Sequence, residues 1–175
     1  MAPAVETWIQ LGSILNRDAL IVVGDAIVRR KRPLATLEQL HVAAHTAFRR
    51  PGVRSLRLAL AEVRPGTDSP QETRSRLLIV RAGLPEPTVG FTVHNDRGDF
   101  VGTPDLFYPL YRVAIEYEGD GHRANDQVFR DDIERAELFQ DAGCRYVRAT
   151  ADDVARPHRL VARVRNALLQ RGWRP

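Results

Sequence analysis

The sequence has little of several features that would narrow its biology: one cysteine, one lysine and no long apolar run. Cys144 alone cannot form an intrachain disulfide, and a structural zinc site, which needs four Cys or His ligands close together, is not expected. No apolar stretch approaches the roughly 20 residues that cross a bilayer, and residues 1–10 lack the charged-then-apolar order of a signal peptide. These absences predict a cytoplasmic protein without a membrane partner.

The composition is that of a globular protein. Hydrophobic residues make up 43% of the chain and charged residues 27%, which allows a buried core and excludes wholesale disorder. The net charge of +4 comes from the front part, because residues 1–68 hold ten Arg or Lys against six Asp or Glu, whereas residues 69–175 hold sixteen of each. Arg29 and Arg30 belong to this excess. They could neutralise phosphates of a nucleic acid or form a solvated helical surface.

The front part has the apolar spacing of short helices. Between residues 8 and 63 the apolar residues recur at helical intervals, and Asp18 and Thr36 are placed to cap helices. The sequence RPGTD at 64–68 predicts a turn and a domain boundary. We therefore expect a helical N-terminal region over residues 1–67, which binds nucleic acid or a partner, and a second domain over residues 68–175.

The second domain has a different order of periodicities. A helix opening at Ser69 is followed by alternating, strand-like patterns and a hairpin turn, and then by a helix, a short strand and a closing helix. This order predicts an α/β fold with a helix, a three-strand antiparallel meander, a helix, a strand and a helix. The predicted strands are 88–93, 100–108, 112–118 and 145–149, and the later helices are 125–142 and 156–170.

Acidic residues gather on one face of the predicted third strand. Alternate side chains of a strand share a face, so Glu116 and Glu118 lie together, and Asp105 joins them if an even number of residues connects the second and third strands. Three carboxylates on one face repel each other unless a cation lies among them, and oxygen ligands favour Mg²⁺ or Mn²⁺. The alternative is that the acids decorate a solvent-exposed face.

Several short motifs carry a resemblance to a known family. With the order of elements described above, residues 68–154 resemble the actinobacterial endonuclease domains related to very-short-patch-repair (Vsr) enzymes, a branch of the PD-(D/E)XK superfamily. The resemblance implies a restriction-endonuclease-like core, preceded here by a small helical region. The matching residues are Ser69-Pro70-Gln71-Glu72, Ala82-Gly83-Leu84-Pro85, Pro104-Asp105-Leu106, Ile115-Glu116-Tyr117-Glu118-Gly119 with His122, and Arg130-Asp131 through Arg135 to Gly143 and Arg148.

The resemblance also implies roles for individual residues. Asp105 becomes the acid of the "PD" element and Glu116 the acid that opens "(D/E)XK", both as metal ligands. The lysine of that motif is absent, because position 118 is Glu118 and the one lysine is Lys31. Glu118 could hold a second metal or act as general base, and His122 or Arg123 could supply the missing positive charge.

Two further candidates, Glu72 and His122, each have a functional and a structural interpretation. Glu72 could contribute a carboxylate to the metal site or complete a capping box with Ser69. His122 could serve the site or be an ordinary loop histidine. Asp131 and Arg135 lie four residues apart on a helix, which favours a surface ion pair. The arginines that could contact nucleic acid are Arg123, Arg130, Arg148, Arg29 and Arg30.

Taken together, these features predict a magnesium- or manganese-dependent endodeoxyribonuclease. It would hydrolyse phosphodiester bonds in DNA, with RNA as the alternative polymer and a homodimer as one way to cut both strands. Two other hypotheses remain open. One is a catalytically inactive nuclease fold that binds DNA or has a regulatory role, and the other is a toxin–antitoxin-type partner protein.

Overall fold

The computed structural model describes residues 3–119 and 126–175, except the side chains of 126–129, 131 and 154. The chain forms two compact units, residues 1–74 and 75–175. The division lies inside a helix, α5 (Pro70–Arg81), while the turn at 64–68 precedes that helix. Among the described residues, none of the helices has the length and apolarity needed to traverse a bilayer.

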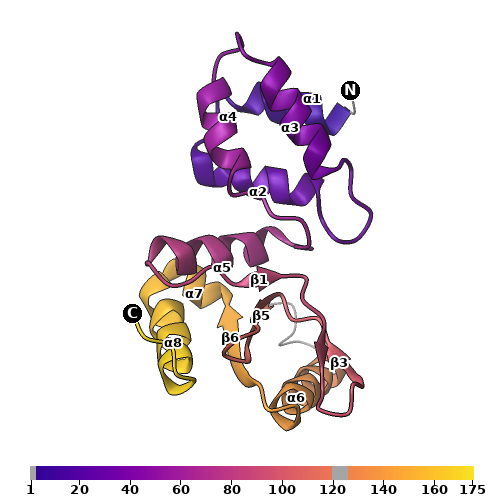
Figure 1. Ribbon diagram of the computed structural model, residues 1–175, viewed down its shortest axis with the longest axis vertical. Coiled ribbons are helices and arrows are strands. Elements are labelled where there is room, and N and C mark those ends of the chain that lie inside the picture. Colours follow the sequence, from indigo (N-terminus) through magenta and orange to yellow (C-terminus); the bar gives the residue numbers. More distant parts are fainter. Residues whose placement is uncertain (1–2, 120–125) are drawn as a thin grey trace. The chain divides into compact units, whose positions relative to one another are not determined.

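The first unit is helical, as its periodicity predicts (Figure 1). Trp8 and Leu20 are fully buried in its core, and the Trp8 indole Nε1 donates a hydrogen bond to the Leu20 carbonyl at 2.9 Å. The buried aromatic ring therefore keeps its one polar atom satisfied. The helices that precede α5 are α1 (Pro3–Leu11), α2 (Arg17–Ile27), α3 (Leu37–Thr46) and α4 (Val53–Leu60).

Helix caps in this unit agree with the sequence at one position and differ at another. Thr36 caps α3, as predicted, and the structure adds that it does so in a full capping box with Gln39. The cap of α2 is Asn16, whose side chain accepts from the Ala19 backbone N–H at 2.9 Å, so the prediction of Asp18 is wrong. Asp18 lies in the first turn instead, where a negative charge interacts favourably with the helix dipole.

The second unit contains a four-stranded mixed sheet in the order β1-β4-β5-β6. β1 and β4 pair antiparallel, as do β4 and β5, while β5 and β6 run parallel. A separate two-stranded sheet pairs β2 with β3. The strands are β1 (Thr88–Val89), β2 (Val93–His94), β3 (Phe100–Gly102), β4 (Leu106–Tyr108), β5 (Val113–Glu118) and β6 (Arg145–Thr150).

The antiparallel pairing order of the predicted three-strand meander is confirmed, but the continuity of its first two strands is wrong. The segment 88–93 divides into β1 and β2 at Gly90, whose φ of 66° is a left-handed conformation that interrupts a strand. The segment 100–108 is also interrupted, at residues 103–105, and forms β3 and β4. The later elements follow the predicted order as α6 (Asp126–Asp141), β6 and α8 (Pro157–Gln170), with a short helix α7 (Ala151–Ala155) that was not predicted.

Each face of the four-stranded sheet is covered by a different helix (Figure 1). On one face, Ile115 and its neighbours pack against Leu160, Val164 and Leu168 of α8. On the other face, Ala114 packs in a cluster with Phe139 of α6. Side chains that alternate along β5 therefore enter two separate apolar clusters, and the α6 face also carries the acids considered next.

Candidate functional site

The register of the β4–β5 hairpin places Asp105 opposite Glu116. Leu106 pairs with Ile115 and Tyr108 with Val113, so the same register continued by one residue brings Asp105 to Glu116. The connection comprises residues 109–112, an even number, which is the condition that the sequence set for a shared face. The even loop length that the prediction required is confirmed, while Asp105 itself lies one residue before the paired part of β4.

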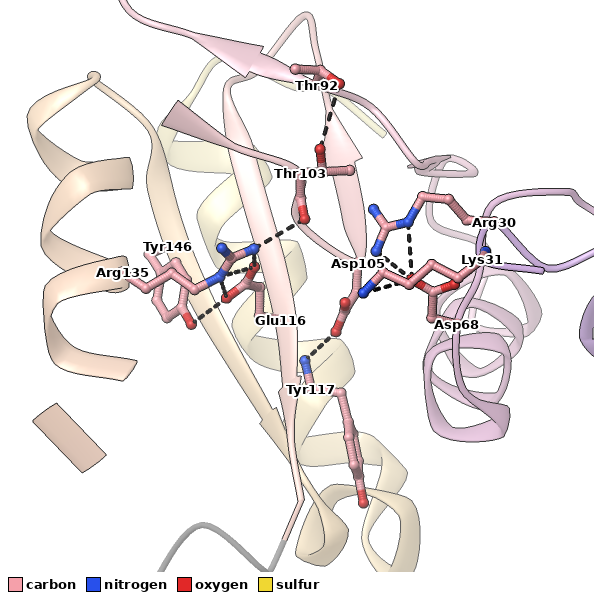
Figure 2. A network of polar contacts seen from close by, with 10 residues as sticks. All are labelled: Arg30, Lys31, Asp68, Thr92, Thr103, Asp105, Glu116, Tyr117, Arg135 and Tyr146. Carbon is pink, nitrogen blue, oxygen red and sulfur yellow. Dashed lines mark hydrogen bonds and ion pairs between the residues drawn. The ribbon is translucent and has the colours of Figure 1, made fainter. Parts of the chain in front are cut away.

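Glu116 is clamped by an arginine from α6 (Figure 2). The Arg135 Nε lies 2.8 Å from both Glu116 carboxylate oxygens, and its Nη2 lies 2.5 Å from Oε1. The same Nη2 donates to the Thr103 carbonyl at 3.0 Å, and the Tyr146 hydroxyl donates to Glu116 Oε2 at 3.1 Å. A buried carboxylate is thus held from two sides by a guanidinium fork and a phenol.

The electrostatics of this cluster stabilise the ionised pair. The hydrogen bond from Arg135 to Glu116 raises the pKa of the guanidinium, outweighing the opposite effect of burial. Burial, and then the nearby Glu116 charge, raise the pKa of Tyr146 well above its usual range. Tyr146 therefore remains a neutral hydrogen-bond donor to Glu116 at every ordinary pH.

The other two acids on this face have their own partners. The half-buried Asp105, which directly precedes β4, accepts a hydrogen bond from the Tyr117 backbone N–H at 2.8 Å through Oδ2 (Figure 2). Glu118 lies 2.6 Å from the Nε of Arg148 on β6. We call Asp105, Glu116 and Glu118 the acid stripe.

The acid stripe fits a metal only with few protein ligands. Among the described residues, no group of three or more His, Cys, Asp or Glu side chains is arranged to hold a metal ion. Mg²⁺ commonly binds through one or two carboxylates and keeps several waters, a requirement that the facing pair Asp105 and Glu116 can meet. Arg135 contacts both Glu116 oxygens, so it would compete with a metal for that carboxylate.

Glu72 belongs to the first unit, and its hydrogen bonds lie at the start of its own helix, α5. Its Oε2 accepts from the Asp68 backbone N–H at 2.8 Å, and its backbone N–H donates to the Ser69 hydroxyl at 3.2 Å. Burial raises the pKa of Glu72 despite these hydrogen bonds. These contacts are of the capping type that the sequence offered as one reading, and the metal role remains a prediction.

The candidate nucleic-acid contacts differ in their surroundings. Arg30 forms an ion pair with Asp68, with Nε at 2.9 Å and Nη2 at 2.5 Å from Oδ2 (Figure 2). Burial works to raise the pKa of Asp68, but the hydrogen bond from Arg30 and that from the Lys31 backbone hold it below its usual value. Arg29 donates from Nε to the Arg32 carbonyl at 3.1 Å. In this cluster Asp68 therefore offsets part of the positive charge.

Several predicted residues lie outside the described part of the chain or in unexpected places. His122, Arg123 and the Asp131 side chain are outside it, while Arg130 and Arg148 are exposed. The surface-pair reading of Arg135 missed its contact with Glu116. That partner lies on a strand 19 residues away, which helical spacing cannot reveal. Thr103 and Tyr146 were missed for the same reason.

Comparison with known proteins yields distant relatives. No family model and no solved structure matches the chain. Two proteins of Mycobacterium tuberculosis, both named as uncharacterized, from strains CDC 1551 / Oshkosh and H37Rv, are each 31% identical over 160 residues, or 90% of this chain. The chain spans 58% of the length of these relatives. A similarity of that extent includes residues of both units.

Proposed function

We propose that the chain is a metal-dependent endonuclease that hydrolyses phosphodiester bonds in DNA. The observation that supports this most directly is the register that sets Asp105 opposite Glu116, with Glu118 two residues further along the same face of β5. The resemblance to the PD-(D/E)XK domains assigns these same positions to the metal site. The register comes from the structure and the motif from the sequence, and both point to one pair of carboxylates.

The proposed cofactor is Mg²⁺ or Mn²⁺, held by Asp105 and Glu116. When bound, such a metal neutralises charge on the phosphate and lowers the pKa of water. Glu118 is the proposed general base, since it lies beside the pair on the same face. Its ion pair with Arg148 at 2.6 Å holds the carboxylate in place at the end of β5.

Arg135 is the proposed source of the positive charge that the missing lysine would bring. Its guanidinium contacts Glu116 directly, although it comes from α6 rather than from β5. Because a guanidinium stays protonated at every ordinary pH, it suits charge stabilisation and not proton transfer. In this arrangement Arg135 orients Glu116 before a metal binds and offsets negative charge near the phosphate afterwards.

The same contact supports a second candidate function. A guanidinium that already satisfies both oxygens of Glu116 can replace a metal permanently, and the chain would then be a nuclease scaffold that binds DNA without cutting it. In the nuclease, a divalent cation takes the place of Arg135 at Glu116. In the scaffold that only binds DNA, Arg135 stays there.

The decisive experiment is a cleavage assay with matched variants. Purified protein is incubated with supercoiled plasmid, and with labelled DNA and RNA oligonucleotides, in Mg²⁺, in Mn²⁺ and in chelator. Because metal catalysis contributes several kcal/mol, Glu116→Ala and Asp105→Asn should each lower the rate by about 100-fold or more. Glu137→Gln, on the exposed surface of α6, is the control and should cut at the wild-type rate.

Each result separates the two candidates. Metal-dependent cleavage that disappears in both acid variants supports the nuclease. Cleavage that survives in Glu116→Ala overturns the assignment of the site. DNA binding without cleavage in any metal overturns the enzyme and supports the scaffold that only binds.

A further inference from the structure

A cleft of about 510 Å³ lies at the edge of the four-stranded sheet, between β6 and α8. β6 is the last strand of the sheet, and in the described part of the chain its outer edge pairs with no other strand. Four exposed arginines line the cleft, Arg145 and Arg148 from β6 and Arg159 and Arg163 from α8. A strand edge and a helix therefore present guanidinium groups to one common space.

The charges in this cleft are only partly compensated. The Arg163 Nη2 lies 2.6 Å from Oδ2 of the buried Asp153 and 2.8 Å from the Arg148 carbonyl. Asp152 also lines the cleft and is exposed. No carboxylate of the described residues pairs with Arg145 or Arg159. The cleft thus keeps two exposed guanidinium groups for a ligand, with one exposed carboxylate near them.

We propose that this cleft binds the phosphodiester backbone of DNA, with Arg145 and Arg159 as its main phosphate contacts. Guanidinium groups donate two parallel hydrogen bonds to phosphate oxygens and are weakly hydrated, which suits backbone recognition. The six residues of β6 span roughly 20 Å at the usual rise of a strand. One strand of a duplex places on the order of five phosphates over that length.

Arg148 connects the cleft to the acid stripe. Its side chain lines the cleft and also forms the ion pair with Glu118. Arg148 therefore links the cleft, which borders α8, to the proposed catalytic acids on the α6 face around the edge of the sheet, and the cleft would hold nucleotides that flank the scissile bond. The choice of DNA as the ligand rests on the proposed function, whereas the recognition of phosphate rests on the cleft itself.

The test is a binding titration in chelator, where no metal-dependent cleavage can interfere. Fluorescence anisotropy of a labelled 30-base-pair duplex is followed from low to high salt for wild type, for Arg145→Gln/Arg159→Gln and for Arg97→Gln/Arg165→Gln. The second double variant removes the same charge from exposed positions outside the cleft. A third variant, Asp152→Asn, removes the carboxylate that would repel phosphate.

The cleft variant should bind DNA at least about tenfold more weakly. The slope of a plot of log Kd against log salt concentration should fall by roughly one for each arginine lost. The control double variant should lose much less, and Asp152→Asn should bind more tightly than wild type. Equal affinities of the two double variants would overturn the cleft as the binding site. Weakened binding together with an uncut plasmid in Mg²⁺ would support the cleft and overturn only the nuclease.

Discussion

On the α8 side of the sheet, β5 contributes Val113, Ile115 and Tyr117 to one apolar cluster, whereas on the α6 side the same strand contributes Ala114 and then two acids. The first face is apolar from end to end. The second face is apolar at Ala114, which packs in a cluster with Phe139, and becomes charged beyond the residue that pairs with the start of β4. One strand thus serves a purely structural face and a face divided between packing and chemistry.

The difference shows what the fold must add to hold charges on a buried surface. Carboxylates removed from water are costly unless they are paired and hydrogen-bonded. Arg135 and Tyr146 supply these partners for Glu116, and Arg148 does so for Glu118. Partners of this kind are unnecessary on the α8 side. The acidic face needs three additional side chains to offset the free-energy cost of burying its carboxylates. A function for these carboxylates would explain why the chain retains them.

The largest expected effect on stability comes from the apolar face. Ile115→Ala should lower the free energy of unfolding by about 3 kcal/mol, because Ile115 is 1% exposed and its truncation leaves a cavity. Urea unfolding monitored by circular dichroism measures this loss. The neighbouring variant Glu116→Gln, which keeps the side-chain shape, should cost about half as much because it weakens a charge-assisted hydrogen bond. If both variants destabilise equally, the contrast between the two faces does not hold.

A smaller effect is expected from the clamp on the acidic face. Arg135→Ala leaves Glu116 with Tyr146 as its remaining side-chain partner and should cost about 2 kcal/mol, less than a fully buried pair because Arg135 is 42% exposed. In the double variant with Glu116→Gln the two costs should not add, and the coupling should be about 1 kcal/mol. Arg165→Ala on α8 is the control for loss of an exposed arginine. Additive costs would mean that the contact contributes no stability.

The smallest effect is expected at the sheet edge, between the two faces. Burial works to raise the pKa of Asp153, but hydrogen bonds from Arg163 and the Thr150 backbone lower it below its usual 3.8. A lowered folded-state pKa adds stability above the unfolded value, and this is lost as pH falls through the folded value. Asp153→Asn should therefore cost about 1 kcal/mol at pH 7 and progressively less below about pH 4. A constant cost in thermal unfolding from pH 7 to pH 3 would contradict the linkage.

The sequence predicts the elements of the molecule better than their partners. Helical periodicity, the Thr36 cap and the alternation in 113–118 depend on residues close in the chain, and the structure agrees with each. The shared face of Asp105 and Glu116 could also be predicted, because it depends only on strand alternation and loop length. These features are local, so neighbouring residues determine them.

Partners that lie far apart in the sequence could not be predicted in the same way. The antiparallel pairing of 88–93 with 100–108 follows the predicted meander, but strand alternation gives no signal of the break that divides each segment into two short strands. Arg135 has a plausible helical neighbour in the sequence, yet it contacts a strand. The arginines of the β6 cleft come from two elements that become neighbours only after folding.

The loop 109–112 also constrains how this chain can vary during evolution. Gain or loss of a single residue there would turn β4 over relative to β5 and move Asp105 to the α8 side, while gain or loss of two would restore the alternation. Length changes in this loop are therefore expected to accumulate in pairs. A descendant with one extra residue would keep every residue of the acid stripe and still lose the site.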